Sequence, residues 1–255
     1  MRLSVAMAAY NGEEYIRQQI DSITDQMRPD DELIISVNPS QDATESIVSE
    51  YAKSDSRIRM LICEEKGIIA NFENAINACT GEVILLADQD DVWNPFKMKL
   101  IRKIFMKMNP ILVLHNTEFC DENLESLGTD LFTMKHVNHG LIYNTVRNGY
   151  MGGCMAFSSE LVPMICPIPR DVAMHDQWIG TVAEYIDSSR IILFSKKLSL
   201  YRRHEGTATA AKGERLPFKT KMRYIRILIK RLNERLAYKK CSNKCCDEES
   251  QCTGK

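Results

Sequence analysis

The sequence predicts an α/β fold with a mostly parallel central sheet flanked by helices. Over the first hundred residues, short apolar runs alternate with stretches in which apolar residues recur every three or four positions. Residues typical of turns separate the two kinds of stretch. Strands that alternate with helices pair in parallel through right-handed crossovers. The 255 residues suffice for one large domain, or for one domain and an appendage.

The elements of this first part are expected in regular order. The apolar runs predict four strands, at Leu3–Met7, Leu33–Val37, Arg59–Cys63 and Glu82–Ala87. The helical patterns between them predict three helices, one starting at Glu13 and two over Ala43–Ala52 and Ile69–Cys79.

The second half is less regular. We expect an amphipathic helix over residues 97–108, a strand over Ile111–His115, and mixed loops with a candidate hairpin between about 117 and 150. The last expected elements of the domain are a helix within Val172–Ile186 and two short strands, Ile191–Phe194 and Lys197–Tyr201.

Charge is distributed unevenly behind a net value of -1. Residues 215–240 carry ten Lys or Arg and one acidic residue, which leaves about -9 on residues 1–214. A nucleic-acid binder usually carries its basic charge on the binding face, so the acidic body argues against a nucleic-acid partner. The basic segment suggests attraction to an anionic surface.

The chain divides into three parts: an α/β domain over 1–210, a basic amphipathic helical arm over 211–240, and a Cys-rich tail over 241–255 that we expect to be disordered. The arm fits either a helix lying on anionic lipid or one packed on the domain. No leader pattern opens the chain, and no apolar run approaches the ~18 residues of a membrane span. We expect a cytoplasmic protein, peripheral on the inner face of the membrane.

Polar residues follow three of the predicted parallel strands. They are Tyr10 and Asn11, then Asn38 and Asp42, and finally the acidic run that starts at Asp88. Ligands of open α/β sheets bind beyond the carboxyl ends of the strands. A common site there explains the three positions better than chance. Gly152 and Gly153 offer close backbone approach to a ligand, although a tight turn explains them equally well.

The strongest chemical signal is Asp88-Gln89-Asp90-Asp91. Three carboxylates within four residues repel one another, and a hard divalent cation compensates them. Mn²⁺ or Mg²⁺ prefers carboxylate and phosphate oxygens. The alternative is an acidic loop that caps the helix starting near Pro95.

This run, continued by Val92-Trp93, resembles the Asp-x-Asp motif of family 2 glycosyltransferases with the GT-A fold, and its Gln and Trp are similar to the rhamnosyltransferase branch. Further blocks occur in the family's order over residues 3–210: Val5–Glu14, Gly67–Asn77, Met174-His175-Asp176-Gln177-Trp178 and Tyr201-Arg202-Arg203-His204. The ordered set is far more specific than any single block.

The resemblance implies a role for each matching residue. Those implied to bind the donor nucleotide are Ala9, Tyr10, Asp88, Arg202 and Arg203, and those implied to hold the metal are Asp90, Asp91 and His204. Asn38 and Asn71 are two further candidates for donor binding, Asn71 because it lies near a helix start where the backbone faces a diphosphate. Asp176 is implied to be the general base that takes a proton from the acceptor hydroxyl. The reaction implied is inverting transfer of a sugar, with rhamnose a candidate, from a dTDP- or UDP-sugar to a saccharide or lipid-linked acceptor in surface polysaccharide assembly.

One position departs from the family. Asn38 stands where the family usually has an aspartate that reads the base, and its amide both donates and accepts hydrogen bonds. The donor nucleotide is therefore open, and a non-catalytic nucleotide-sugar binder is one alternative. A nucleotidyltransferase is another, but Ala8–Glu14 lacks the Gly-rich basic loop that it would need. Asp42 is expected mainly to cap the following helix, and His175 either orients Asp176 or forms a polar helix start.

Overall fold

The computed structural model describes residues 1–204, 222–223 and 225–234. Its elements, in chain order, are β1 (Leu3–Ala9), α1 (Ile16–Thr24), β2 (Glu32–Val37), α2 (Thr44–Ser54), β3 (Ile58–Ile62), α3 (Ile68–Ala78), β4 (Val83–Asp88), β5 (Val92–Trp93), α4 (Lys97–Met108), β6 (Leu112–Cys120), β7 (Ser126–Asp130), α5 (Leu131–Lys135), α6 (Leu141–Arg147), η1 (Gly152–Cys154), β8 (Met155–Ser158), η2 (Ser159–Leu161), α7 (Val162–Ile165), α8 (His175–Asp187), η3 (Ser188–Arg190) and β9 (Ile191–Arg202).

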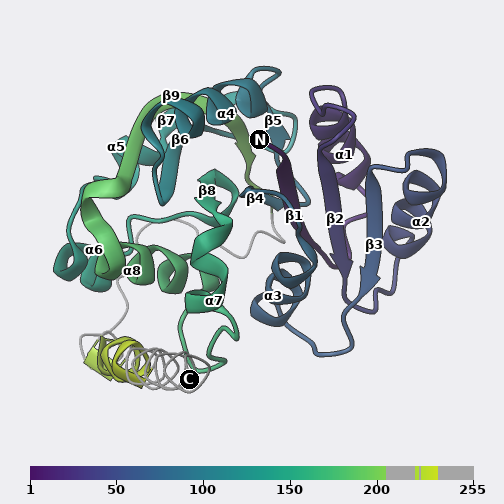
Figure 1. Ribbon diagram of the computed structural model, residues 1–255. Helices are drawn as coiled ribbons and strands as arrows, with labels where there is room; N and C mark the ends of the chain where they lie inside the picture. The colour runs from purple at the N-terminus through teal and green to yellow at the C-terminus, as the bar shows by residue number, and fades with distance from the viewer. Residues whose placement is uncertain (205–221, 224, 235–255) are drawn as a thin grey trace, which may run out of the picture.

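One mixed sheet runs through the described part of the chain, in the order β3-β2-β1-β4-β8-β6-β9-β5, with β7 added beside β6 (Figure 1). The first half is parallel, because β1 pairs in parallel with β2 and with β4, and β2 does so with β3. β8 is antiparallel to both of its neighbours, β4 and β6. The predicted α/β fold with a mostly parallel sheet flanked by helices is confirmed.

Alternation along the central strands places one helical layer on each face of the sheet. On β1, Ala6 belongs to the apolar cluster that contains Phe72 of α3, whereas Val5 belongs to the cluster that contains Ile20 of α1. Successive side chains of a strand point to opposite faces, so strands buried on both faces must be apolar throughout. This explains why these strands read as continuous apolar runs.

β9 corrects the sequence-based prediction of two short strands. It is continuous and pairs in parallel with β6, which itself extends beyond the predicted end at His115. The register shifts where His115 pairs with Phe194 and Asn116 with Lys197. Such a bulge accommodates extra residues without ending the strand. The polar residues at the bulge look like a loop in the sequence.

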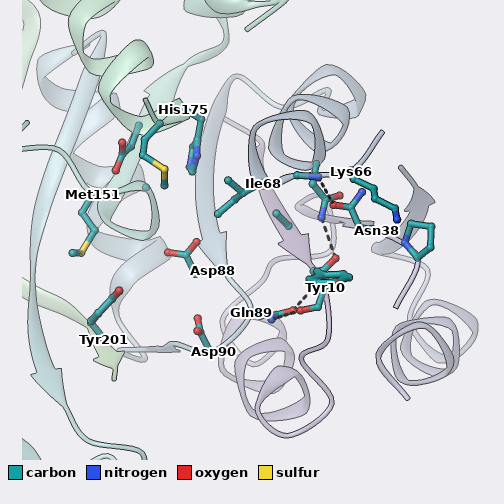
Figure 2. A pocket seen from close by; sticks show the side chains of 18 of the residues that line it. Tyr10, Asn38, Lys66, Ile68, Asp88, Gln89, Asp90, Met151, His175 and Tyr201 are labelled. Carbon is teal, nitrogen blue, oxygen red and sulfur yellow. Dashed lines mark hydrogen bonds between the residues drawn. The ribbon is translucent and has the colours of Figure 1, made fainter. Parts of the chain in front are cut away.

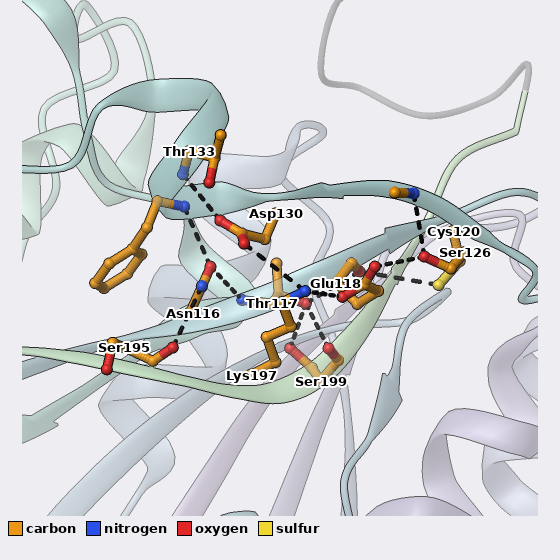
Figure 3. Close-up of polar contacts among 12 residues, drawn as sticks. Asn116, Thr117, Glu118, Cys120, Ser126, Asp130, Thr133, Ser195, Lys197 and Ser199 are labelled. Atoms are coloured by element: carbon orange, nitrogen blue, oxygen red, sulfur yellow. Dashed lines mark hydrogen bonds and ion pairs between the residues drawn. The ribbon is translucent and has the colours of Figure 1, made fainter.

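Polar side chains on β6 hold its neighbours in place (Figure 3). Asn116 donates to the Ser195 carbonyl oxygen at 3.3 Å and accepts from the Phe132 N–H of α5 at 3.1 Å. The Thr117 hydroxyl donates to the Ser199 carbonyl oxygen at 2.7 Å. Buried polar groups are tolerated when they are paired in this way. The antiparallel pair of β6 and β7 is the predicted hairpin.

The described part of the basic arm is a helix packed on the domain (Figure 1). Leu228 and Leu232 are buried in the cluster that contains Trp178 of α8, and Arg231 pairs with Asp171 at 2.9 Å. Packing on the domain is therefore the arrangement over residues 222–223 and 225–234, where Ile229 stays 52% exposed. The rest of the predicted arm and the whole Cys-rich tail lie outside the described residues. Among the described helices, none has the length and apolarity to cross a bilayer.

Candidate functional site

A cavity of about 470 Å³ opens at the carboxyl ends of β1, β2 and β4 (Figure 2). Its wall contains Ala8, Ala9, Tyr10, Asn38, Pro39, Gln41, Lys66, Gly67, Ile68, Asn71, Asp88, Gln89, Asp90, Met151, Gly152, Met174, His175, Asp176 and Tyr201. This is the edge where open α/β sheets bind ligands. Tyr10, Asn38 and Asp88, each predicted after a separate strand, thus share one cavity with the predicted base, whereas Asn11 and Asp42 are not part of its wall.

Gln89 ties the loop after β4 to the loop after β1. Its amide accepts from the Tyr10 N–H and donates to the Tyr10 carbonyl oxygen, both at 2.8 Å. A Cβ at Gly12 would lie 2.3 Å from the Gln89 side-chain oxygen, so only glycine leaves room for this contact. The paired backbone fixes Tyr10 while its ring remains exposed and free to stack on a flat ligand.

The Asn38 side chain forms most of its hydrogen bonds with backbone groups of the protein. Its amide nitrogen donates to the carbonyl oxygens of Cys63 at 2.7 Å and Glu65 at 2.9 Å, and its oxygen accepts from the Gly67 N–H at 3.3 Å. Both donor hydrogens are used, so one lone pair of the side-chain oxygen is left for a ligand. Asn38 therefore shapes the loop over residues 63–67, which contributes Lys66 to the wall.

Asn71, in the first turn of α3, differs from Asn38 because its side-chain oxygen makes no hydrogen bond within the described residues. Its amide nitrogen donates to the Ala9 carbonyl oxygen at 3.0 Å, and the Asn38 N–H bonds the same oxygen at 3.0 Å. The Asn71 side-chain oxygen is buried without a hydrogen-bond partner among the described residues. A buried acceptor left unpaired costs free energy, which a ligand N–H or O–H in the cavity would recover.

Asp88 ends β4 against the backbone of η1. A Cβ at Gly153 would lie 2.9 Å from a carboxylate oxygen of Asp88 and equally close to one of Asp91, so glycine permits the approach. Burial first, and then the charges of Asp90 and Asp176, raise the pKa of Asp88 to about 7. The site thus gathers negative charge that a cation would relieve.

Lys97, the first residue of α4, lies behind these carboxylates. Its side chain is fully buried, its ammonium donates to the Gly153 carbonyl oxygen at 2.8 Å, and it stands 3.7 Å from the centre of the Trp93 ring. Burial lowers the pKa of Lys97 to about 8, while Asp91 and Asp88 oppose the shift. The lysine is an internal counter-charge for the acidic motif.

Asp91 and Arg202 hold the acidic motif, residues 88–91, in place through hydrogen bonds. Asp91 is 1% exposed and accepts from the Arg202 N–H at 3.3 Å, and burial raises its pKa. The Arg202 guanidinium donates to the Asp90 carbonyl oxygen at 2.9 Å and to Gln18 at 2.6 Å, and lies over the Tyr15 ring. Neither Asp91 nor Arg202 is part of the cavity wall.

The two predicted metal residues Asp90 and His204 meet. The His204 Nε2 lies 2.9 Å from an Asp90 carboxylate oxygen. The residues of the described part form no group of three or more His, Cys, Asp or Glu that could cage a metal. Mg²⁺ and similar cations are often held by one or two protein ligands together with substrate phosphate oxygens. The pair fits a cation shared with a diphosphate, and does not fit an all-protein metal site.

Asp176 enters the cavity from the first turn of α8. It is 7% exposed, and one carboxylate oxygen accepts from the Gln177 N–H at 2.5 Å. Its charge contributes, after burial and the charge of Asp90, to the raised pKa of Asp88. The first turn of a helix also favours a negative charge. The predicted base and two carboxylates of the acidic motif, Asp88 and Asp90, therefore line one cavity.

The predicted site residues separate into two groups. Seven of them line the cavity: Ala9, Tyr10, Asn38, Asn71, Asp88, Asp90 and Asp176. The remaining four, Asp91, Arg202, Arg203 and His204, lie outside its wall. Arg203 lies over the Phe119 ring and donates to the Met134 sulfur.

Sequence reasoning missed Lys97 and the bridging role of Gln89. The helix dipole disfavours a lysine in the first turn, so Lys97 at the start of the predicted helix over residues 97–108 indicates a compensating negative charge nearby. Gln89 offered no comparable signal, because its partner Tyr10 is 79 residues away. Asp42 behaves as predicted: it accepts from the Thr44 N–H at 3.0 Å at the start of α2, and also from the Glu13 N–H.

Solved structures share this fold. The S. aureus protein TarS, residues 1–349, in complex with UDP-GlcNAc superimposes with a TM-score of 0.69 at 21% identity over 90% of this chain and 66% of that one. The mannosyltransferase PcManGT from Pyrobaculum calidifontis, in complex with GDP-Man and Mn²⁺, gives a TM-score of 0.60 at 17% identity over 92% and 73%. These likenesses confirm the GT-A-like fold.

Curated relatives are similar over part of their length. The putative teichuronic acid biosynthesis glycosyltransferase TuaG of Bacillus subtilis is 27% identical over 60% of each chain. The Escherichia coli protein WfgD, a UDP-Glc:alpha-D-GlcNAc-diphosphoundecaprenol beta-1,3-glucosyltransferase, is 31% identical over 48% of this chain and 47% of its own. The chain thus spans less than two thirds of either relative, and neither is named as a rhamnosyltransferase.

The model of the family described as Glycosyl transferase family 2 matches residues 4–166. The match covers more than half of the chain, and it includes the acidic motif and the β1 loop that form one side of the cavity. The chain belongs to glycosyl transferase family 2.

Proposed function

We propose that the protein is a metal-dependent, inverting glycosyltransferase that moves a sugar from a nucleoside-diphosphate sugar to a hydroxyl of a saccharide or lipid-linked acceptor. The observation that carries the proposal is the shared cavity: Asp90, paired with His204, and Asp176 approach it from different elements. A donor bound through its diphosphate at the first pair would bring its sugar toward the second carboxylate.

The residues divide the work of a direct displacement. Asp176 takes the proton of the acceptor hydroxyl, whose oxygen attacks the anomeric carbon while the bond from that carbon to the diphosphate breaks. A single displacement inverts the anomeric configuration. Asp90 and His204 would hold Mn²⁺ or Mg²⁺ together with diphosphate oxygens, and the cation supplies neutralisation of the charge on the leaving group.

The donor is proposed to be a UDP- or dTDP-sugar. The relatives support a uracil nucleotide, since WfgD is named for UDP-Glc and TarS was solved with UDP-GlcNAc. The resemblance to the rhamnosyltransferase branch keeps dTDP-rhamnose as the second candidate. The one free lone pair of the Asn38 oxygen would accept from the imide N–H that uracil and thymine share.

The acceptor is proposed to belong to surface polysaccharide assembly. TuaG is named for teichuronic acid biosynthesis, and WfgD for a lipid-linked diphosphate acceptor. Described residues of the arm place the basic side chains Arg223, Arg226 and Lys230 on a helix. Such charges favour an anionic lipid or a lipid diphosphate.

The test is release of nucleotide from UDP-glucose, UDP-N-acetylglucosamine and dTDP-rhamnose with Mn²⁺ and lipid-linked saccharides as acceptors. We expect turnover by the unmodified protein and a loss of about 10²- to 10⁴-fold in Asp176→Asn, with nucleotide binding retained. The exposed Asp30→Asn is the matched control and should keep full turnover. Equal turnover in Asp176→Asn would remove the proposed base. Binding without turnover in any combination would favour the non-catalytic alternative.

A further inference from the structure

His175 has an unusual environment for a histidine that the proposed reaction does not use. Its side chain is 2% exposed, and neither ring nitrogen has a hydrogen-bond partner among the described residues. The ring stacks on Phe72 of α3, with centroids 4.1 Å apart and planes inclined by 26°. The stack fixes the ring plane, and therefore the directions in which the two nitrogens point.

The unpaired ring belongs to the cavity. His175 lines the wall, and Figure 2 shows the ring extending into the cavity on the side where Asp88 lies. Gly152 lines the same wall, and a Cβ at that position would lie 2.7 Å from Nε2. Glycine at 152 therefore lets the chain pass close to this nitrogen without a side-chain clash. Buried polar groups without partners are rare, and a bound ligand is one of the ways in which they are satisfied.

The chemistry of the ring selects the kind of group that it meets. Burial lowers the pKa of His175, so the ring is neutral and offers one donor and one acceptor. A phosphate, which only accepts, would leave one nitrogen unpaired and would be repelled by the neighbouring Asp176 carboxylate. A hydroxyl both donates and accepts, and it carries no charge.

We propose that the His175 imidazole hydrogen-bonds a hydroxyl of the sugar carried by the donor nucleotide and so selects which sugar is transferred. This inference rests on the proposed function. The position of the ring favours the donor sugar as its partner, because the ring stacks on Phe72 of α3. Asn71 precedes Phe72, the α3 residue on which the ring stacks, and donates to the Ala9 carbonyl oxygen at the end of the cavity where the nucleotide is proposed to bind. His175 and Asp176 are adjacent in sequence, so the sugar would be hydrogen-bonded beside the proposed base.

Calorimetric titration tests the inference without any acceptor. Dissociation constants with Mn²⁺ are measured for UDP and dTDP and for UDP-glucose, UDP-N-acetylglucosamine and dTDP-rhamnose. His175→Phe keeps the stack on Phe72 and removes both nitrogens. It should weaken the preferred sugar nucleotide about tenfold while changing the affinity for the bare diphosphate less than twofold. His175→Gln, which keeps a donor and an acceptor, should recover part of the loss. His139→Phe at an exposed site is the matched control.

Deoxygenated sugar nucleotides provide a second measurement that needs no large change in the protein. The unmodified protein should lose affinity for the one deoxy analogue that lacks the contacted hydroxyl. His175→Gln should discriminate against that analogue less strongly.

An unchanged ratio of sugar-nucleotide to nucleotide affinity in a folded His175→Phe would overturn the inference and leave the proposed function standing. So would an unmodified protein that binds UDP but gains no affinity from any attached sugar. Absence of all nucleotide binding by the unmodified protein would instead remove the proposed function, and the inference with it.

Discussion

Asp88 shows how a single residue couples the site to pH. Burial and the nearby charges of Asp90 and Asp176 raise its pKa to about 7 from an ordinary value of 3.8. Between these values the folded state binds a proton that the unfolded state does not. The stability that this proton contributes is therefore complete below about pH 4 and is lost as pH rises through 7. A cation in the cavity would reverse the preference, because it favours the charged carboxylate.

The metal-free protein should accordingly lose stability through Asp88 as pH rises from 5.5 to 8. The expected difference in the free energy of unfolding is about 1 kcal/mol or more relative to Asp88→Asn, measured by urea denaturation at both pH values. The comparison with the variant is needed because burial lowers the pKa of His115 and His175, which act in the opposite direction. Identical pH dependence in the two proteins would contradict a raised pKa at Asp88.

At the scale of an element, α4 carries a charge where a helix does not favour it. Lys97 occupies the first turn, at the positive end of the helix dipole, and is fully buried. The Gly153 carbonyl, the Trp93 ring and the carboxylates of Asp88 and Asp91 stabilise it there. The helix start thus joins the acidic motif to the η1 turn that carries Gly152 and Gly153.

Removal of this cation should destabilise the protein strongly. We expect Lys97→Met to lower the free energy of unfolding by about 3 kcal/mol, because buried carboxylates lose their compensating charge. Lys99→Met, at an exposed position two residues along the same helix, should change it by less than about 0.5 kcal/mol. Denaturant unfolding at one pH compares the two. Similar stabilities would mean that Lys97 is not the counter-charge.

The elements of the first half could be predicted, because their signals are local. β1, β2, β3 and β4 are short apolar runs, and α1, α2 and α3 show helical periodicity. Predicted and observed ends therefore agree within a few residues. β9 could not be predicted as one strand, because its continuity depends on pairing with β6 through a bulge. The hydrogen bonds that Arg202 donates to Gln18 and to the Asp90 carbonyl oxygen could not be predicted either, because they join segments far apart in sequence.

Across the whole molecule, one sheet carries the site. β5, directly after the acidic motif, pairs antiparallel with β9, and this pairing brings His204 beside Asp90 across 114 residues of sequence. The parallel strands present Tyr10, Asn38 and Asp88 at one edge, and α8 adds Asp176 from the second half. Topology therefore explains why residues recognised one block at a time converge on a single cavity.

The central claim is that this cavity binds a nucleoside diphosphate together with a cation. Calorimetric titration of the unmodified protein with UDP, dTDP and GDP, each with and without Mn²⁺, tests it most directly. We predict binding that depends on Mn²⁺ and prefers UDP or dTDP to GDP. A folded protein that binds none of the three diphosphates, with or without the cation, would contradict the claim.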